Sequence, residues 1–232
     1  MQLTMPESNL PALWRKRLYL PAYMVKEAAM LAGVVPRTVS SWHYGYKLSE
    51  HRRSAPVFAK GRERGRPLSY LELVEVAFVG RFRQMNMPLK EIRIAHDYLS
   101  KLWTAEYPFA QLRLKTEGYE ILADFEPSQS YVAANKAGQL LWADLIERRI
   151  QEFDYEHEMA LRWHPRGQSV PVVVDPRISF GSPTLERSGI STWIIKERRE
   201  AGESHDEIAD DFGISLGDVH IALEFEGVEL AA

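Results

Sequence analysis

The 232-residue chain contains no cysteine, which excludes both a disulfide framework and a zinc site built on thiolates. It has no run of 18 apolar residues, and its first stretch, MQLTMPESNLPALWRKRL, lacks the apolar core of a signal peptide. The sequence therefore predicts a soluble cytoplasmic protein. An apolar share of 45% and an aromatic share of 11% are ordinary for globular proteins.

The chain also lacks the residue groupings that catalysis requires. Its seven histidines are scattered, and His157 and His164 have no third ligand at the spacing of a metal site. Ser204, His205 and Asp206 are adjacent in the sequence, and adjacent residues cannot produce the geometry of a catalytic triad. We therefore expect no enzyme, no metal site and no cofactor.

Positive charge is scarce beyond the first quarter of the chain. Residues 1–66 hold twelve Lys or Arg and four Asp or Glu, whereas residues 67–232 hold seventeen and twenty-eight. The formal net charge is only −3, so the asymmetry is hidden in the total. A basic first part on an acidic body suggests a polyanion partner at one end and a basic partner at the other. Compositional drift remains the alternative explanation.

A helix-turn-helix pattern lies in the basic part. The stretch YMVKEAAMLAGVVPRTVSSWHYGYK, residues 23–47, predicts two short helices, of which the second begins at Pro36. Ala29 is small enough for the second helix to cross it, and Gly33 permits the positive φ of a tight turn. Val39 and Trp42 are then expected to fill the core between the helices.

The exposed face of that second helix and the following loop carry the residue types that bind DNA. Arginine forms paired hydrogen bonds with guanine, and hydroxyl groups bind phosphate oxygens or base edges. The loop of residues 49–67 is rich in Arg, Gly and Pro, which is typical of a loop or β-wing; a solvated tail is the alternative. The predicted DNA-binding residues are Pro36, Arg37, Thr38, Ser40, Ser41, Tyr44, Lys47, Arg52, Arg53, Arg62, Arg64 and Arg66.

The rest of the chain predicts a mixed fold that is mainly helical. Ser69 and Glu72 form a capping box before an amphipathic helix, and a second helix follows Pro88. Alternating runs predict a hairpin over 109–125, and a helix is expected over 138–153. Strands are expected over 159–163 and 171–175.

We therefore predict an α+β fold, mainly α, in three parts. These are an N-terminal winged helix-turn-helix domain with following helices (1–104), a small mixed connecting region (105–170) and an acidic C-terminal helix-turn-helix-like domain (171–232).

The acidic domain repeats the spacing of the first motif. Ala209, Gly213 and Val219 are separated by four and six residues, as are their counterparts Ala29, Gly33 and Val39. The stretch EIADDFGISLGDVHIALEF, residues 207–225, contains five carboxylates and no Lys or Arg. Such a face repels a phosphate backbone. Two interpretations remain open for it: a solvated face, or a surface for protein contact or dimerisation.

Both ends of the chain resemble known families. Residues 175–225 are similar to a domain of unknown function found in antitoxins that are paired with PIN-like ribonucleases. The matching positions are Pro176, Phe180, Gly181, Pro183, Gly202, Glu203, Ser204, Ile208, Ala209 and Val219. Ser188-Gly189-Ile190 replaces the family's Thr-Arg-Ile, so no role of that arginine is carried over. Residues 23–101 resemble a MerR-type winged helix.

Together these resemblances match long VapB-like antitoxins of VapBC-type pairs. They imply a protein that inhibits a cognate PIN-like ribonuclease toxin and represses its own operon at a palindromic operator, as a homodimer or a larger toxin–antitoxin assembly. The speculative toxin-binding residues are Arg162, Trp163, Arg166, Asp210, Asp211 and Asp218. The alternative function is a stand-alone MerR-like transcription regulator whose C-terminal part dimerises or senses an effector.

Overall fold

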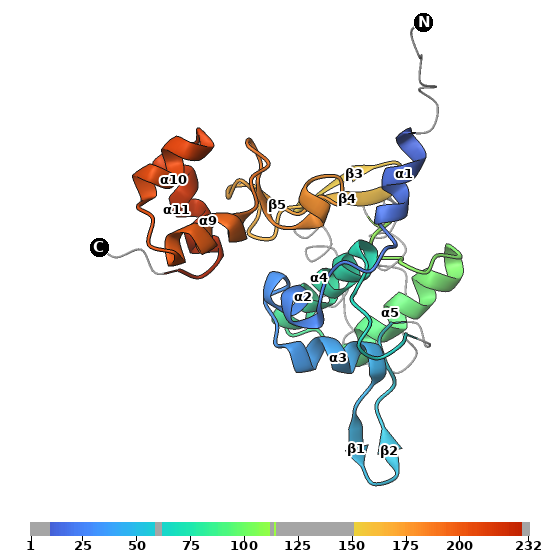
Figure 1. Ribbon diagram of the computed structural model, residues 1–232. Coiled ribbons are helices and arrows are strands. Elements are labelled where there is room, and N and C mark those ends of the chain that lie inside the picture. The colour runs from blue at the N-terminus through green and yellow to red at the C-terminus, as the bar shows by residue number, and fades with distance from the viewer. Residues whose placement is uncertain (1–9, 59–61, 112–113, 115–150, 229–232) are drawn as a thin grey trace, which may run out of the picture. The chain divides into compact units, whose positions relative to one another are not determined.

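The computed structural model describes residues 10–58, 62–111, 114 and 151–228 (Figure 1). Helices dominate, and the strands form small two-stranded sheets. The predicted class, α+β and mainly α, is confirmed. In the described part of the chain, no helix is long and apolar enough to cross a membrane.

The described residues form two compact units. The first, here called the winged-helix unit, comprises residues 18–58, 62–111, 114, 151 and 155–160. The second, here called the terminal unit, comprises residues 10–17, 152–154 and 161–228. The winged-helix unit continues beyond residue 104 to residues 105–111 and 155–160, and the terminal unit includes residues 161–170 as well as 10–17. Arg17 donates a hydrogen bond to the carbonyl oxygen of Pro176 (3.4 Å), within the terminal unit.

The winged-helix unit is built from four helices and a β-hairpin (Figure 1). Its core is apolar, and the side chains of Val39, Trp42, Phe78 and Phe82 are at most 2% exposed. A capping box between Ser69 and Glu72 starts the longest helix, as predicted. The elements are α2 (Val25–Leu31), α3 (Pro36–Tyr44), β1 (Lys47–Ser49), β2 (Arg52–Arg53), α4 (Tyr70–Gln84) and α5 (Leu89–Leu102).

The described residues of the terminal unit combine short strands with four α-helices. Val172 and Val173 are fully buried and pair with Leu185 and Thr184 in an antiparallel sheet, so the predicted strand at 171–175 is confirmed. The elements are α1 (Leu10–Arg17), β5 (Val172–Val173), the 3-10 turn η1 (Ser179–Gly181), β6 (Thr184–Leu185), α9 (Thr192–Glu200), α10 (His205–Phe212) and α11 (Leu216–Phe225).

A further hairpin contains β3 (Phe153–Glu156) and β4 (Met159–Trp163), and it confirms the extended segment expected at 159–163. The helix expected over 138–153 does not reach its predicted end, because Phe153 begins a strand and is buried there. The rest of that helix, and the predicted hairpin at 109–125 apart from residues 109–111 and 114, lie outside the described residues.

Candidate nucleic-acid interface and the acidic helical hairpin

Helices α2 and α3 form the predicted helix-turn-helix. Ala29 is fully buried where α3 crosses α2, and its carbonyl oxygen accepts a hydrogen bond from the Val34 amide at 2.9 Å. Gly33 has φ of 65°, which non-glycine residues rarely adopt. Val39 and Trp42 are buried between the helices. Small, flexible and apolar positions therefore have the structural roles that their spacing predicted.

Helix α3 turns its polar residues away from that core. Pro36 and Arg37 are exposed in its first turn, and Thr38, Ser40 and Ser41 are half-buried along it. The hydroxyl of Ser41 donates to the carbonyl oxygen of Thr38 at 2.7 Å, so its proton is already used within the helix. Arg37 is thus an exposed cation at the start of a helix whose opposite face is anchored in the core.

The basic loop begins as a β-hairpin beside α3. Lys47 pairs with Arg53 and Ser49 with Arg52 in an antiparallel ladder, which places three cations on one short wing. Lys47, Arg52 and Arg53 are all exposed. The loop therefore contains the β-wing that was one of the two expected forms, and the tail interpretation does not apply to these residues.

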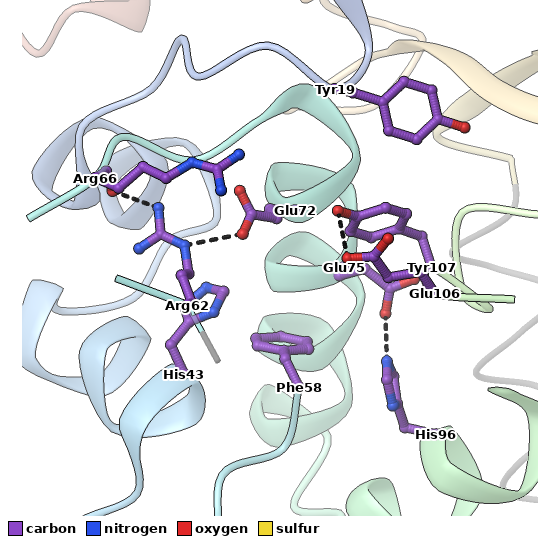
Figure 2. Close-up of a pocket in the computed structure, with 10 residues that line it drawn as sticks. All are labelled: Tyr19, His43, Phe58, Arg62, Arg66, Glu72, Glu75, His96, Glu106 and Tyr107. Carbon is purple, nitrogen blue, oxygen red and sulfur yellow. Dashed lines mark hydrogen bonds and ion pairs between the residues drawn. The ribbon is translucent and has the colours of Figure 1, made fainter. Parts of the chain in front are cut away.

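Arg62 and Tyr44 have roles that the sequence did not indicate. The Arg62 side chain is only 6% exposed, and its Nε lies 2.8 Å from a carboxylate oxygen of Glu72. Its Nη1 also donates to the Tyr44 hydroxyl at 2.9 Å (Figure 2 shows the pair with Glu72). Arg62 is therefore withdrawn from the predicted phosphate contacts, because its charge is neutralised inside the unit. Arg64 and Arg66 remain exposed, with Arg64 over the Tyr44 ring.

Arg93 is a residue that sequence reasoning missed. From α5, its guanidinium donates to the carbonyl oxygens of Pro56 and Ala55, each at 2.9 Å, and to the Ser54 hydroxyl at 3.3 Å. It thereby fastens the segment that follows β2, residues 54–56, to the helical core. An arginine on a helical pattern carries no signal of this role, because its partners are backbone atoms some 38 residues away.

Helices α10 and α11 repeat the first hairpin closely. Each residue lies 180 positions after its counterpart, so that Ala209, Gly213 and Val219 match Ala29, Gly33 and Val39. Gly213 has φ of 62°, and the Ile214 amide donates to the Ala209 carbonyl at 3.0 Å, as Val34 does to Ala29. Val219 is fully buried. The shared spacing therefore reflects a shared local structure.

The exposed positions of the two hairpins differ in chemistry. Arg37 is replaced by Gly217, Ser40 by His220 and Tyr44 by Glu224. Glu224 and His220 are exposed on α11, and Asp206 and Asp210 are exposed on α10. The second hairpin has lost the one arginine of the first and gained carboxylates. This surface opposes contact with phosphates.

Two of the three predicted acidic contacts already have partners within the terminal unit. Asp218 accepts hydrogen bonds from the Ser215 hydroxyl (2.7 Å) and amide (3.1 Å), in a capping box that starts α11. Asp211 forms an ion pair with Arg198 of α9. For Asp210, the described residues provide no side-chain partner. The acidity of this hairpin is therefore partly helix capping, and Asp210 is the residue best placed for an outside partner.

The segment RWHPRG, residues 162–167, contains three of the predicted toxin-binding residues and is not a free loop, because its first two residues belong to β4. Trp163 is 1% exposed and stacks on Phe153, with ring centroids 5.8 Å apart, so it is a core residue. Arg162 belongs to β4, and its guanidinium lies within 4 Å of carboxylates of Asp154, Asp175 and Glu186. Its charge is thus compensated.

Arg166 is exposed in a turn and lies over the Phe225 ring, 5.6 Å from the centroid. It is the one member of the segment that keeps its predicted exposure. In the described ranges, no group of three or more His, Cys, Asp or Glu side chains is arranged to hold a metal ion.

Known proteins resemble both the terminal unit and the chain as a whole. Residues 172–225 match the family described as "Protein of unknown function (DUF433)", and this match contains α9, α10 and α11. The chain is 26% identical to "Putative antitoxin VapB45" of Mycobacterium tuberculosis over 235 aligned residues, which cover 90% of this chain and 95% of that protein. This chain resembles an antitoxin.

Two other similarities support the same architecture. The chain is 25% identical to "Uncharacterized protein Rv2308" of Mycobacterium tuberculosis, covering 88% of this chain and 89% of that one. The crystal structure of Rv2018 from Mycobacterium tuberculosis has a TM-score of 0.70 at 22% identity, covering 89% of this chain and 99% of that chain. The antitoxin-like chain therefore shares its fold with an experimentally determined structure.

Proposed function

We propose that this chain is the antitoxin of a toxin–antitoxin pair, which inhibits a PIN-like ribonuclease and represses its own operon. The observation that carries the proposal is the difference between its two helical hairpins. One presents Arg37 beside a wing with three cations, and the other has no arginine and exposes the carboxylates of Asp206, Asp210 and Glu224. The similarity to "Putative antitoxin VapB45" over 90% of the chain supports the antitoxin role.

The DNA half of the proposal uses the MerR-like winged helix. Two protomers would place their α3 helices in successive major grooves of a palindromic operator, and Arg37 would bind a guanine. Lys47, Arg52 and Arg53 on the wing would contact phosphates, together with Arg64 and Arg66. Thr38, Ser40 and Pro36 complete the surface next to the bases. No step requires a catalytic group or a cofactor.

The toxin half assigns the acidic hairpin to protein contact. PIN-like ribonucleases act on a polyanionic substrate, and an acidic surface complements a basic rim on such an enzyme. Asp206, Asp210 and Glu224 are exposed for this purpose, and Leu216 adds an apolar side chain that is 43% exposed. Arg166 could contribute from the neighbouring turn.

Growth measurements test the proposal. Expressing the adjacent gene of the operon alone should arrest growth, and co-expressing this chain should restore it. A variant that carries both Asp206→Lys and Asp210→Lys tests the acidic hairpin. It should be produced in the same amount as the unchanged chain but restore growth poorly. If the adjacent product is harmless alone, the antitoxin function is refuted and a stand-alone transcription regulator becomes the better account.

A further inference from the structure

A cavity of about 390 Å³ lies inside the winged-helix unit, beside the helix that carries Arg37. Its walls come from the end of α3, the segment after the wing, and helices α4 and α5 (Figure 2). All lining residues belong to this one unit. The volume falls in the range of sites that bind small molecules.

His43 lines this cavity with a nitrogen that is left unpaired. The residue is 6% exposed, and its Nε2 has no hydrogen-bond partner among the described residues. Burial, together with the nearby Arg62 guanidinium, lowers the pKa of His43 to about 4. The ring is therefore neutral at physiological pH and offers one donor and one acceptor. Buried polar atoms normally have partners, and a group bound in the cavity would supply one for this nitrogen.

The charged side chains around the cavity already compensate one another. Arg62 is bound to Glu72 at 2.8 Å. One carboxylate oxygen of Glu75 accepts the amides of Phe109 (2.8 Å) and Ala110 (3.2 Å), and the other lies 3.1 Å from His96 Nε2. The buried charged groups are therefore already engaged by other groups of the winged-helix unit.

At its rim the cavity has one exposed residue of each sign, Arg66 and Glu106. Glu106 accepts the Tyr107 hydroxyl at 3.0 Å. Burial and Glu106 raise the pKa of that hydroxyl, so it stays protonated and remains a donor. The two exposed charges at the rim are of opposite sign, so the rim by itself selects neither an anion nor a cation.

Aromatic rings supply the remaining walls. Phe58 lies between two imidazoles, with its ring centroid 4.7 Å from that of His43 and 5.8 Å from that of His96 (Figure 2). Tyr19 and Tyr107 form a second ring pair at 6.1 Å. Flat faces of this kind favour a planar guest, which can stack or meet them edge to face.

We propose that this cavity binds an uncharged planar ring compound that carries both a hydrogen-bond donor and an acceptor, and that the compound bonds to His43. Arg62 joins the cavity wall to Tyr44 at the end of α3, so the guest would rest against the DNA-reading helix. The site is independent of both the ribonuclease and the operator, and it adds a small molecule to the proposed partners.

Three probes of equal size and different charge test this site in the full-length chain. Isothermal titration with benzamide (neutral, donor and acceptor), benzoate (anion) and benzamidine (cation) should show saturable binding of benzamide. We expect a Kd at or below about 1 mM for this small ring. The two ions should bind at least tenfold more weakly. If either ion binds as tightly as benzamide, or if none of the three binds, the proposal is overturned.

A variant separates a bond to His43 from unspecific binding. His43→Phe keeps the ring shape but removes both nitrogens, and it should weaken benzamide binding at least tenfold. His51→Phe, at the exposed wing tip, is the matched control and should bind as the unchanged chain does. Circular dichroism melting should show His43→Phe folded, since it replaces a buried unpaired nitrogen with carbon. If His43→Phe does not fold, Phe58→Leu takes its place and should also weaken benzamide binding at least tenfold. If benzamide binds a folded variant as tightly as it binds the unchanged chain, the proposed site is refuted.

Discussion

His43 makes the stability of this protein depend on pH. Its pKa is about 4 in the folded protein because of burial and Arg62, and near 6.5 in the unfolded chain. Between these values the unfolded chain binds a proton that the folded protein does not. The free energy of unfolding must therefore fall as the pH decreases through this window.

Urea unfolding at pH 7 and pH 4.5 measures this effect. The His43 contribution to the free energy of unfolding should fall by about 2 kcal/mol between these two values. His43→Phe should lose that part of the pH dependence, whereas His51→Phe should retain it. Identical pH dependence in His43→Phe and the unchanged chain would show that His43 is not buried in its neutral form.

Residue identity indicated exposure less well than it indicated secondary structure. Arg62 is predicted as a DNA contact because it stands in a basic loop, and Trp163 as a toxin contact because arginines stand near it in the sequence. In the structure Arg62 is paired with Glu72 and Trp163 is packed on Phe153. Their partners are 10 residues away in each case, and no local pattern marks them. Burial of single side chains depends on tertiary contacts, which a lone sequence does not reveal.

Elements with strong local signals were predictable. The turn glycines Gly33 and Gly213 and the capping boxes at Ser69 and Ser204 follow rules that involve only a few neighbouring residues. A third box, Ser215 with Asp218, was missed because Asp stands where Glu or Gln is usual. Asp218 is accordingly among the predicted toxin-binding residues, although its carboxylate caps α11.

Gly45 lies at the base of the wing, and we expect it to be essential for the wing to form. Gly45 has φ of 67°, and a Cβ atom there would lie 2.1 Å from the carbonyl oxygen of Ser54. Gly45→Ala should therefore lower the free energy of unfolding by about 3 kcal/mol, through strain and displacement of the wing base. It should also weaken DNA binding.

Gly65→Ala is the matched control for that substitution. Its φ is also positive, at 86°, but a Cβ atom would meet no other atom within 4 Å. Only the backbone cost of about 1 kcal/mol applies. Thermal or chemical unfolding of both variants measures the difference, and equal losses would mean that the contact at Ser54 does not define the wing.

At the scale of the whole molecule, the chain uses one local structure twice with opposite surface charge. The positions Ala29, Gly33 and Val39 and their counterparts maintain the same helix crossing, since their side chains are set by packing. The exposed positions are not constrained by packing and are free to differ. This separation explains why the fold of the second hairpin was predictable while its partner is a matter for experiment.

The first hairpin is proposed to bind DNA and the second to bind the ribonuclease. Measuring the binding of operator DNA and of the ribonuclease to the same set of variants tests this separation most directly. Fluorescence anisotropy with labelled operator and labelled ribonuclease would measure both affinities at fixed salt. Arg37→Ala should weaken DNA binding by roughly 1–3 kcal/mol and leave ribonuclease binding unchanged. Asp210→Lys should weaken ribonuclease binding and leave DNA binding no weaker. If Arg37→Ala weakens ribonuclease binding equally, or Asp210→Lys reduces operator affinity, the two hairpins do not have separate roles.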